Sequence, residues 1–449
     1  MSNNFSFRST VKKYKNSSVC LAVCSVLALI LANTPYKDVF LGWWTMPVSL
    51  SLGEFNFFAH HGHALTLGAV INDFLMAIFF LSVGLEIKRE ILVGELSSRQ
   101  KAMLPIIGAC GGMLVPVLLF WLVCPADADM MRGVAIPMAT DIAFSLGVLS
   151  LFGSRVPIGL KMFLAALAVA DDLGGIIVIA LFYSSEINVM FLFFSLLCVV
   201  ALVAGNMKRV VAKSYYLAVG IVLWYCMLNS GIHATIAGVI VAFCVPASLK
   251  KCSSHYIERI RENIAMLPVH DINVPHHTVV ITNTEIHLLK SIESAADHLI
   301  SPLQDLEDSL KSIIGYFIVP LFALANVGIN FEGMSVSALF TGVGLPVMVG
   351  LVVGKFVGVF SFSWLAVRMG FVSLPAGCEW RSFASVCMLC GIGLTVSIFI
   401  ADLSYSSLVG GSAILAQAKL GILCGSLVSA TVAVFLLNRY LPKSACVNK

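Results

Sequence analysis

The sequence predicts an all-α polytopic membrane protein, and three observations support that fold class. Hydrophobic residues make up 59% of the 449 residues and charged residues only 12%, against about 45–50% and about 25% in soluble globular proteins. The apolar residues gather into runs of about 20, the length of a helix that spans a bilayer. Basic residues concentrate in every second loop between these runs, as in chains that cross a membrane repeatedly. This composition excludes a soluble enzyme, a disordered chain and a coiled coil.

The apolar runs predict twelve transmembrane helices. They lie near residues 18–34, 67–87, 103–124, 131–152, 158–183, 187–205, 213–228, 231–249, 313–331, 345–367, 383–402 and 412–438. The first run follows basic residues, like a signal peptide, but because further spans follow it we expect an uncleaved first helix. The thirteen cysteines lie mostly inside apolar runs, so we interpret them as reduced thiols that pack as small hydrophobes.

The loop charges predict that both termini are cytoplasmic. With residues 1–17 inside, the basic residues of the inside loops far outnumber those of the outside loops, which is the positive-inside pattern. The inside set comprises Lys88, Arg89, Arg99, Lys101, Arg155, Lys161, Lys208, Arg209, Lys213, Lys250, Lys251, Arg259, Arg261, Arg368, Arg381, Arg439 and Lys443, and the outside set only Lys37 and Arg132. We therefore expect helices 1–8 within residues 18–249, helices 9–12 within 313–438, and a cytoplasmic tail at 439–449.

Residues 250–312 are expected to form the one long cytoplasmic loop. Apolar residues recur at helical spacing over 285–310, interrupted by Pro302, which predicts an amphipathic helix on the membrane or on the bundle. The alternating residues of 268–283 predict a strand or hairpin. This loop holds His270, His276 and His277, and the first outside loop holds His60, His61 and His63. We interpret both trios as solvated loop residues, with a metal site as the less favoured alternative.

Five ionisable residues fall inside the predicted spans, where a charge costs several kcal/mol and usually marks an ion pathway. Asp141 is in the fourth span, Asp171 and Asp172 are adjacent in the fifth, Lys355 is in the tenth and Asp73 is in the second. Any one of them could belong to a structural ion pair. Four lie at mid-span, however, and three acids against one base leave the group short of positive charge. Such a group is stable when a carboxylate is protonated or a cation fills the gap.

The cytoplasmic end of the second span carries two further acids. Glu86 and Glu90 are four residues apart, so they share one face of a helix. They are expected to collect cations and to respond to pH at a cytoplasmic mouth. A solvated helix end with ordinary ion pairs is the alternative.

Two of the predicted spans contain helix breakers near their centres. The segment 133–141 contains Pro137 and ends at Asp141, and the segment 390–397 contains Gly391 and Gly393. Broken helices at corresponding positions of two halves indicate a transporter built from inverted repeats, with its site at the bilayer midplane. The half-helix ends need compensating charge, which Asp141 is expected to supply to the positive N-terminal ends and Lys355 to the negative C-terminal ends.

Six motifs in order resemble the NhaA-type sodium/proton antiporters, over about residues 15–440. The motifs are Ile71–Ala77, Gly84–Glu90, Ala139–Phe144, Asp171–Gly174, Ser230–Thr235 and Cys390–Thr395. The resemblance implies an inverted-repeat fold with two broken helices crossing at the midplane, in a bacterial inner membrane. It implies electrogenic, pH-regulated exchange of expelled Na⁺ or Li⁺ for entering protons.

The resemblance also implies roles for particular residues. Asp171 and Asp172 would bind the proton and the metal ion, with Asp172 the more direct ligand, and Thr140 and Asp141 would lie at the crossing. Lys355 would compensate the helix ends and pair with Asp171. The cytoplasmic pH-sensing region would contain Glu86 and Glu90, and His233 would modulate the pH response.

One segment departs from the family pattern. Many relatives have a Leu-Glu-His…His-Pro-Trp run before the ninth span, whereas this chain reads Leu306–Ile313 and keeps only the glutamate, Glu307. The departure concerns the pH set-point rather than the transport chemistry.

Three other functions remain as alternatives. A sodium-coupled symporter of a small organic anion would need a second polar pocket, a cation channel would need a symmetric filter segment, and a membrane sensor would need an output domain. The expected partners are Na⁺, Li⁺, H⁺ and membrane lipid, with a homodimer left open. No cofactor is expected, and the net charge of +4 gives no indication of nucleic acid.

Overall fold

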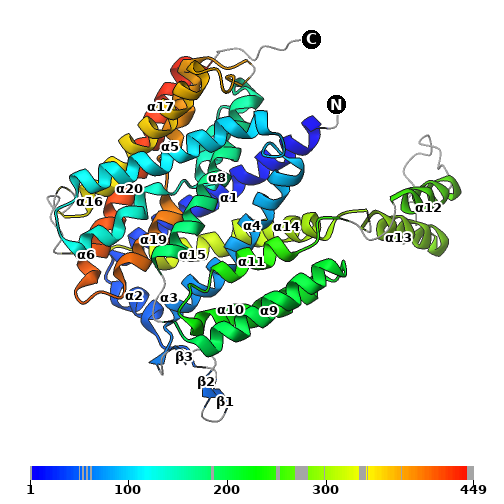
Figure 1. The fold of residues 1–449 in the computed structure, drawn as a ribbon, viewed down its shortest axis with the longest axis horizontal. Coiled ribbons are helices and arrows are strands. Elements are labelled where there is room, and N and C mark those ends of the chain that lie inside the picture. Colours follow the sequence, from blue (N-terminus) through cyan, green and yellow to red (C-terminus); the bar gives the residue numbers. More distant parts are fainter. Residues whose placement is uncertain are drawn as a thin grey trace.

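Helices make up almost all of the chain that the structure, a computed structural model, describes. The described residues are 3–49, 51–52, 55–56, 59–60, 63–183, 187–248, 253–267, 282–297, 299–332, 340, 342–375 and 377–441. Most helices gather into one bundle, with the start of α1 and the end of α20 toward one end and the short strands at the opposite end (Figure 1). The predicted helical class is therefore confirmed.

The first half of the chain contains the short strands and the first broken helix. Its elements are α1 (Asn3–Ala32), α2 (Lys37–Thr45), β1 (Ser51–Leu52), β2 (Phe55–Asn56), β3 (Ala59–His60), β4 (His63–Ala64), α3 (Leu67–Val70), the π-helical η1 (Ile71–Leu75), α4 (Met76–Val93), α5 (Arg99–Val123), α6 (Ala128–Met131), the 3₁₀ helix η2 (Arg132–Met138), α7 (Ile142–Ser150), the 3₁₀ helix η3 (Gly153–Arg155), α8 (Ile158–Phe182) and α9 (Val189–Met207). Two antiparallel pairs of two-residue strands, β1 with β2 and β3 with β4, are a feature that the sequence analysis did not predict.

The second half is helical throughout its described residues. Its elements are α10 (Lys213–Ser230), α11 (Ile236–Cys244), α12 (Ser253–Met266), α13 (Asn283–Asp297), α14 (Pro302–Ile313), the π-helical η4 (Ile314–Ile318), α15 (Val319–Asn326), α16 (Gly344–Val349), the π-helical η6 (Gly350–Gly354), α17 (Lys355–Arg368), α18 (Trp380–Leu389), α19 (Leu394–Tyr405) and α20 (Gly411–Tyr440).

By length and hydropathy, seven of the described helices are able to cross a membrane. Three further pairs of helices meet the same criterion but are bent at a short break, which gives up to ten spans among the described residues. The remaining candidates are α10, with 18 residues, and α11, with only 9. The structure thus supports a multi-pass membrane protein.

Two of the bent pairs are the spans in which the sequence contains helix breakers. The α6–η2 segment meets α7 at 42°, and α18 meets α19 at 43°. In the first, the chain becomes extended at Ala139 and Asp141, directly after a 3₁₀ turn that contains Pro137. In the second, a turn at Cys390 and Gly391 separates the two helices.

Small residues on α5 allow α17 to pack close beside it. A Cβ added at Gly111 or at Gly358 would overlap the facing backbone, and one at Gly112 would lie 3.6 Å from Lys355 Nζ. Close approach through small residues is the usual way in which membrane helices associate. This contact fixes the buried start of α17, where Lys355 lies.

The segment predicted as a cytoplasmic loop contains two helices that extend away from the bundle and one that joins it. The helices α12 and α13 pack on each other and project to one side (Figure 1). Pro302 separates α13 from α14, with Ser301 capping the new helix through Gln304 N, and α14 continues into the apolar ninth span. The predicted strand or hairpin at 268–283 falls almost wholly outside the described residues.

Candidate functional site

The two broken helices cross each other at their breaks. Asp141 N donates to the carbonyl oxygen of Ile392 at 2.7 Å, so the break in one span hydrogen-bonds to the break in the other. Further bonds join them on both sides of the crossing, from Ser145 Oγ to Leu389 O at 3.0 Å and from Ser397 Oγ to Ile136 O at 2.8 Å. The partner span thus satisfies several of the backbone groups that the breaks leave free.

The Asp141 carboxylate lies at the N-termini of two half-helices. Its Oδ1 accepts from Phe144 N at 3.1 Å, in the first turn of α7. Its Oδ2 accepts from Thr395 N at 3.2 Å and from Thr395 Oγ1 at 2.8 Å, in the first turn of α19. Helix N-termini carry partial positive charge, so this one buried carboxylate faces two of them.

Asp171 forms a fully buried ion pair with Lys355. The ammonium of Lys355 contacts Asp171 Oδ2, and neither side chain is exposed. Thr140 Oγ1 lies 2.6 Å from the same oxygen and 2.9 Å from the carbonyl oxygen of Cys390. The pair therefore lies against the break between α18 and α19.

Asp172 lines a cavity that Asp171 does not line. The cavity has a volume of about 390 Å³, and Thr140, Asp141 and Glu86 line it as well. Asp172 is 5% exposed, and its Oδ1 has no hydrogen-bond partner among the described residues. A buried carboxylate oxygen without a partner is costly. Asp171 Oδ1 also lacks a hydrogen-bond partner among the described residues, but the other oxygen of Asp171 contacts Lys355, so Asp172 is the acid here that most needs a proton or a cation.

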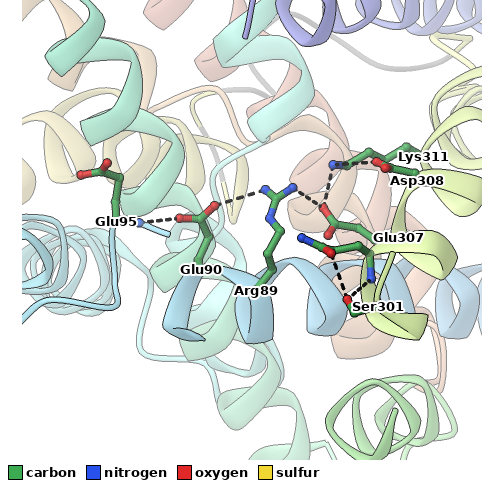
Figure 2. Close-up of polar contacts among 8 residues, drawn as sticks. Arg89, Glu90, Glu95, Ser301, Glu307, Asp308 and Lys311 are labelled. Carbon is green, nitrogen blue, oxygen red and sulfur yellow. Dashed lines mark hydrogen bonds and ion pairs between the residues drawn. The ribbon is translucent and has the colours of Figure 1, made fainter. Parts of the chain in front are cut away.

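A network of charges joins α4 to α14 (Figure 2), and two of its residues, Asp308 and Lys311, line the cavity. Glu307 is buried, with 1% of its side chain exposed, and pairs with Arg89 Nη1 at 2.9 Å and with Lys311 Nζ at 2.6 Å. Arg89 Nη2 also pairs with Glu90 Oε1 at 3.2 Å, and Glu90 Oε2 accepts from Glu95 N at 2.9 Å. Glu86, by contrast, lines the cavity itself.

Two predicted site residues lie apart from the buried acids and the cavity. His233, between α10 and α11, packs its ring edge-on against Phe399 with centroids 5.5 Å apart, and its Nδ1 lies 2.9 Å from Thr235 Oγ1. Asp73 lies in the π-turn η1, where its carbonyl oxygen accepts from Trp224 Nε1 at 3.3 Å. Neither residue is among those that line the cavity.

The fold brings together several polar residues that were not predicted as site residues. Thr395 bonds Asp141, and Arg89 and Lys311 both pair with Glu307. Beside Asp73, the amide of Asn72 bonds Asp402 Oδ2 at 2.7 Å and exchanges hydrogen bonds with Asn326. Thr395 lies two residues after Gly393, and this closeness to the glycine-rich break is the one local signal that could have indicated it.

No group of three or more histidine, cysteine, aspartate or glutamate side chains suited to a resident metal occurs among the described residues. The side chains of His60, His61, His63, His270, His276 and His277 lie outside the described set. No disulfide joins any of the described cysteines.

Comparison with known proteins identifies the family. The profile of the family described as Na⁺/H⁺ antiporter 1 matches residues 8–437. A protein of Phocaeicola vulgatus named Na(+)/H(+) antiporter NhaA is 50% identical over 441 residues, which is 98% of this chain and 97% of that protein. Proteins of the same name are 48% identical in Bacteroides fragilis, over 95% of this chain and 96% of that one, and 44% identical in Porphyromonas gingivalis, over 94% and 93%.

The chain belongs to the Na⁺/H⁺ antiporter 1 family. The predicted resemblance is therefore confirmed, and it extends over nearly the whole chain. Since members of this family are antiporters, the family is one of transporters and not of enzymes. In this Na⁺/H⁺ antiporter 1 member, the crossing of the broken helices and the buried acids lie inside the matched region.

Proposed function

We propose that this chain exchanges Na⁺ or Li⁺ for protons across a membrane, with the buried carboxylates as the shared binding site. The observation that carries the proposal is the position of Asp172, which lies at the cavity wall with a partnerless oxygen. Asp171 beside it is held by Lys355. The relatives named as Na⁺/H⁺ antiporters support the same assignment.

Competition between protons and the metal ion follows from the chemistry of the site. Na⁺ is a hard cation that exchanges its water for oxygen ligands, and the Asp172 carboxylate and the Thr140 hydroxyl present such oxygens. A protonated Asp172 is a poor cation ligand, whereas an ionised Asp172 buried beside a second carboxylate is unstable without a cation. One site therefore holds protons or Na⁺, but not both at once.

The adjacent pair of Asp171 and Lys355 provides the second proton. When Na⁺ binds, Lys355 loses a proton and releases Asp171 to the ion, and when Na⁺ leaves, Lys355 takes up a proton and the pair forms again. Uptake of more than one proton per Na⁺ moves net charge, so the proposed exchange is electrogenic. Asp141 and Lys355 compensate the half-helix ends in this scheme.

We propose a membrane arrangement that goes with this activity. The chain crosses a bacterial inner membrane twelve times as two inverted repeats, with the broken helices crossing at the midplane and both termini in the cytoplasm. The cavity then opens to the cytoplasm. Glu86, Glu90, Glu307 and His233 adjust the exchange to pH, two copies form a homodimer in lipid, and no cofactor takes part.

Proton flux in everted vesicles tests the function. Na⁺ or Li⁺ added to vesicles that hold a respiration-driven proton gradient is expected to collapse the gradient, and K⁺ is not. Asp172→Asn removes the charge without changing the size of the side chain and is expected to abolish the Na⁺ response. Asp127→Asn, at an exposed position between α5 and α6, is the matched control and should respond like the wild type.

Two results would contradict the proposal. Wild-type flux in Asp172→Asn would remove Asp172 from the site. A gradient that collapses only when an organic anion accompanies Na⁺ would indicate a symporter instead.

A further inference from the structure

The cavity that Asp172 lines has a positive charge, that of Lys311, at its exposed end. Four acids line it, namely Glu86, Asp141, Asp172 and Asp308, and Lys311 is the only basic side chain among its described lining residues. The exposed end is marked by Asp308, with 76% of its side chain exposed. The buried end is marked by Asp172, at 5%. Lys311 lies at the exposed end, because its Nζ is 3.8 Å from Asp308 Oδ1.

The ammonium of Lys311 is held in place by its own helix. Its Nζ lies 2.6 Å from Glu307 Oε1 and 3.8 Å from Asp308 Oδ1. Both acids are on α14 at helical spacing from Lys311, and 18% of the Lys311 side chain is exposed. Lys311 is therefore a fixed charge at the rim and not a freely moving surface lysine.

Lys311 is not the only residue that neutralises the charge of Glu307 among the described residues. Arg89 Nη1 already pairs with the same carboxylate at 2.9 Å, so Glu307 has a cationic partner without Lys311. Of the two bases, only Lys311 lines the cavity. The charge of Lys311 thus acts on whatever the cavity contains.

We infer that Lys311 sets the apparent affinity for the transported alkali cation by opposing its entry into the acidic cavity. The inference rests on the proposed antiport. A like charge at the rim raises the energy of a cation inside by Coulomb repulsion, and because the rim is partly hydrated the effect is moderate and reduced by salt. The charge of Lys311 thereby keeps the cation site from being saturated at low Na⁺ concentration.

The test is the Na⁺ dependence of proton flux in everted vesicles made from Lys311 variants. Lys311→Gln is expected to lower the KM for Na⁺ and for Li⁺ about three- to tenfold, and Lys311→Arg should keep the wild-type KM. Added choline chloride should shrink the difference between Lys311→Gln and wild type as it screens the rim charge. Lys213→Gln is the control, because Lys213 also pairs with an acid of α14, Asp305, at 2.6 Å but does not line the cavity.

A second pair of variants separates a direct effect of Lys311 from an effect through Glu307. In the Glu307→Gln background, Lys311→Gln should again lower the KM by a similar factor. If that second decrease is absent, Lys311 acts only by neutralising Glu307, and the inference is wrong. Wild-type flux with an unchanged KM in Lys311→Gln also overturns the inference about Lys311, but it leaves the proposed antiport intact. Absence of Na⁺-dependent flux in the wild type overturns both the inference and the proposed antiport.

Discussion

The buried pair of Asp171 and Lys355 is the residue-level feature on which the site depends most. Neither side chain is exposed, so each charge is stable only because the other is present. Asp172, the next residue, lines the cavity instead, and its Oδ1 has no hydrogen-bond partner among the described residues. Two adjacent carboxylates of the same type are thus made chemically different by their surroundings.

Removal of Lys355 alone is expected to destabilise the protein. Lys355→Met leaves Asp171 as a buried, uncompensated charge, with an expected loss of about 3–5 kcal/mol. The double variant Asp171→Asn/Lys355→Met removes both charges and should recover most of the loss. Thermal unfolding of the purified protein in detergent measures both, and a double variant no more stable than Lys355→Met would contradict the account.

The charged residues of the site were predictable from the sequence because charges are rare inside apolar runs. The polar residues that bond to one another across the bundle were not predictable in this way. Thr395 reaches Asp141, and Asn72 reaches Asp402, across distances along the chain that no local pattern spans. Such pairs depend on how the helices cross, which side-chain packing decides.

At the scale of elements, the site depends on the close approach of the two broken spans at their breaks. Gly393 lies where the two broken spans meet, and a Cβ added there would come within 2.8 Å of the carbonyl oxygen of Ala139 and 2.6 Å of Ser397 Oγ. A backbone atom on the partner span cannot move aside without moving the crossing. The close crossing therefore requires glycine at this position.

Gly393→Ala is expected to destabilise the protein by about 1–3 kcal/mol and to impair Na⁺-dependent flux, because it pushes the spans apart. Gly175→Ala, in α8, is the matched control, since a Cβ there meets no atom within 4 Å. Alanine in that helix should leave stability equal or slightly higher. Equal unfolding temperatures for the two variants would show that the crossing tolerates the added atom.

The positions of these breaks were predictable, whereas other helix distortions were not. Pro137, Gly391 and Gly393 are local signals that favour a break in a helix. The π-turns η1 and η6 contain no proline, so no local residue pattern predicts them. In the same way, an amphipathic helix on the membrane or on the bundle was predicted over 285–310, but its continuation from α14 into the ninth span was not. The contact of α14 with α4 depends on the tertiary packing.

At the scale of the whole molecule, the distribution of charge predicts topology. The loops rich in lysine and arginine alternate with loops that are poor in them, and the described helices include up to ten spans with bent pairs counted, besides α10 and α11. Twelve crossings follow if α10 and α11 also cross. The short 9-residue α11 is the weakest span by length, and it packs between α4 and α10.

Fusion reporters test the number of crossings. Green fluorescent protein fused after Lys449 should fluoresce, because the C-terminus is expected in the cytoplasm. Alkaline phosphatase fused after Ile187, before α9, should be active, and the same enzyme fused after Lys208, between α9 and α10, should be inactive. An active phosphatase at both positions would contradict the crossing of α9.

The central claim is that protons and Na⁺ compete for the carboxylates at the bottom of one cavity. The most direct measurement is calorimetric titration of Na⁺ or Li⁺ into the purified protein over a range of pH. We expect the apparent dissociation constant to rise up to about tenfold for each unit by which the pH falls while the site takes up a proton, with proton release on binding and no binding in Asp172→Asn. A dissociation constant independent of pH, or wild-type binding in Asp172→Asn, would contradict the account.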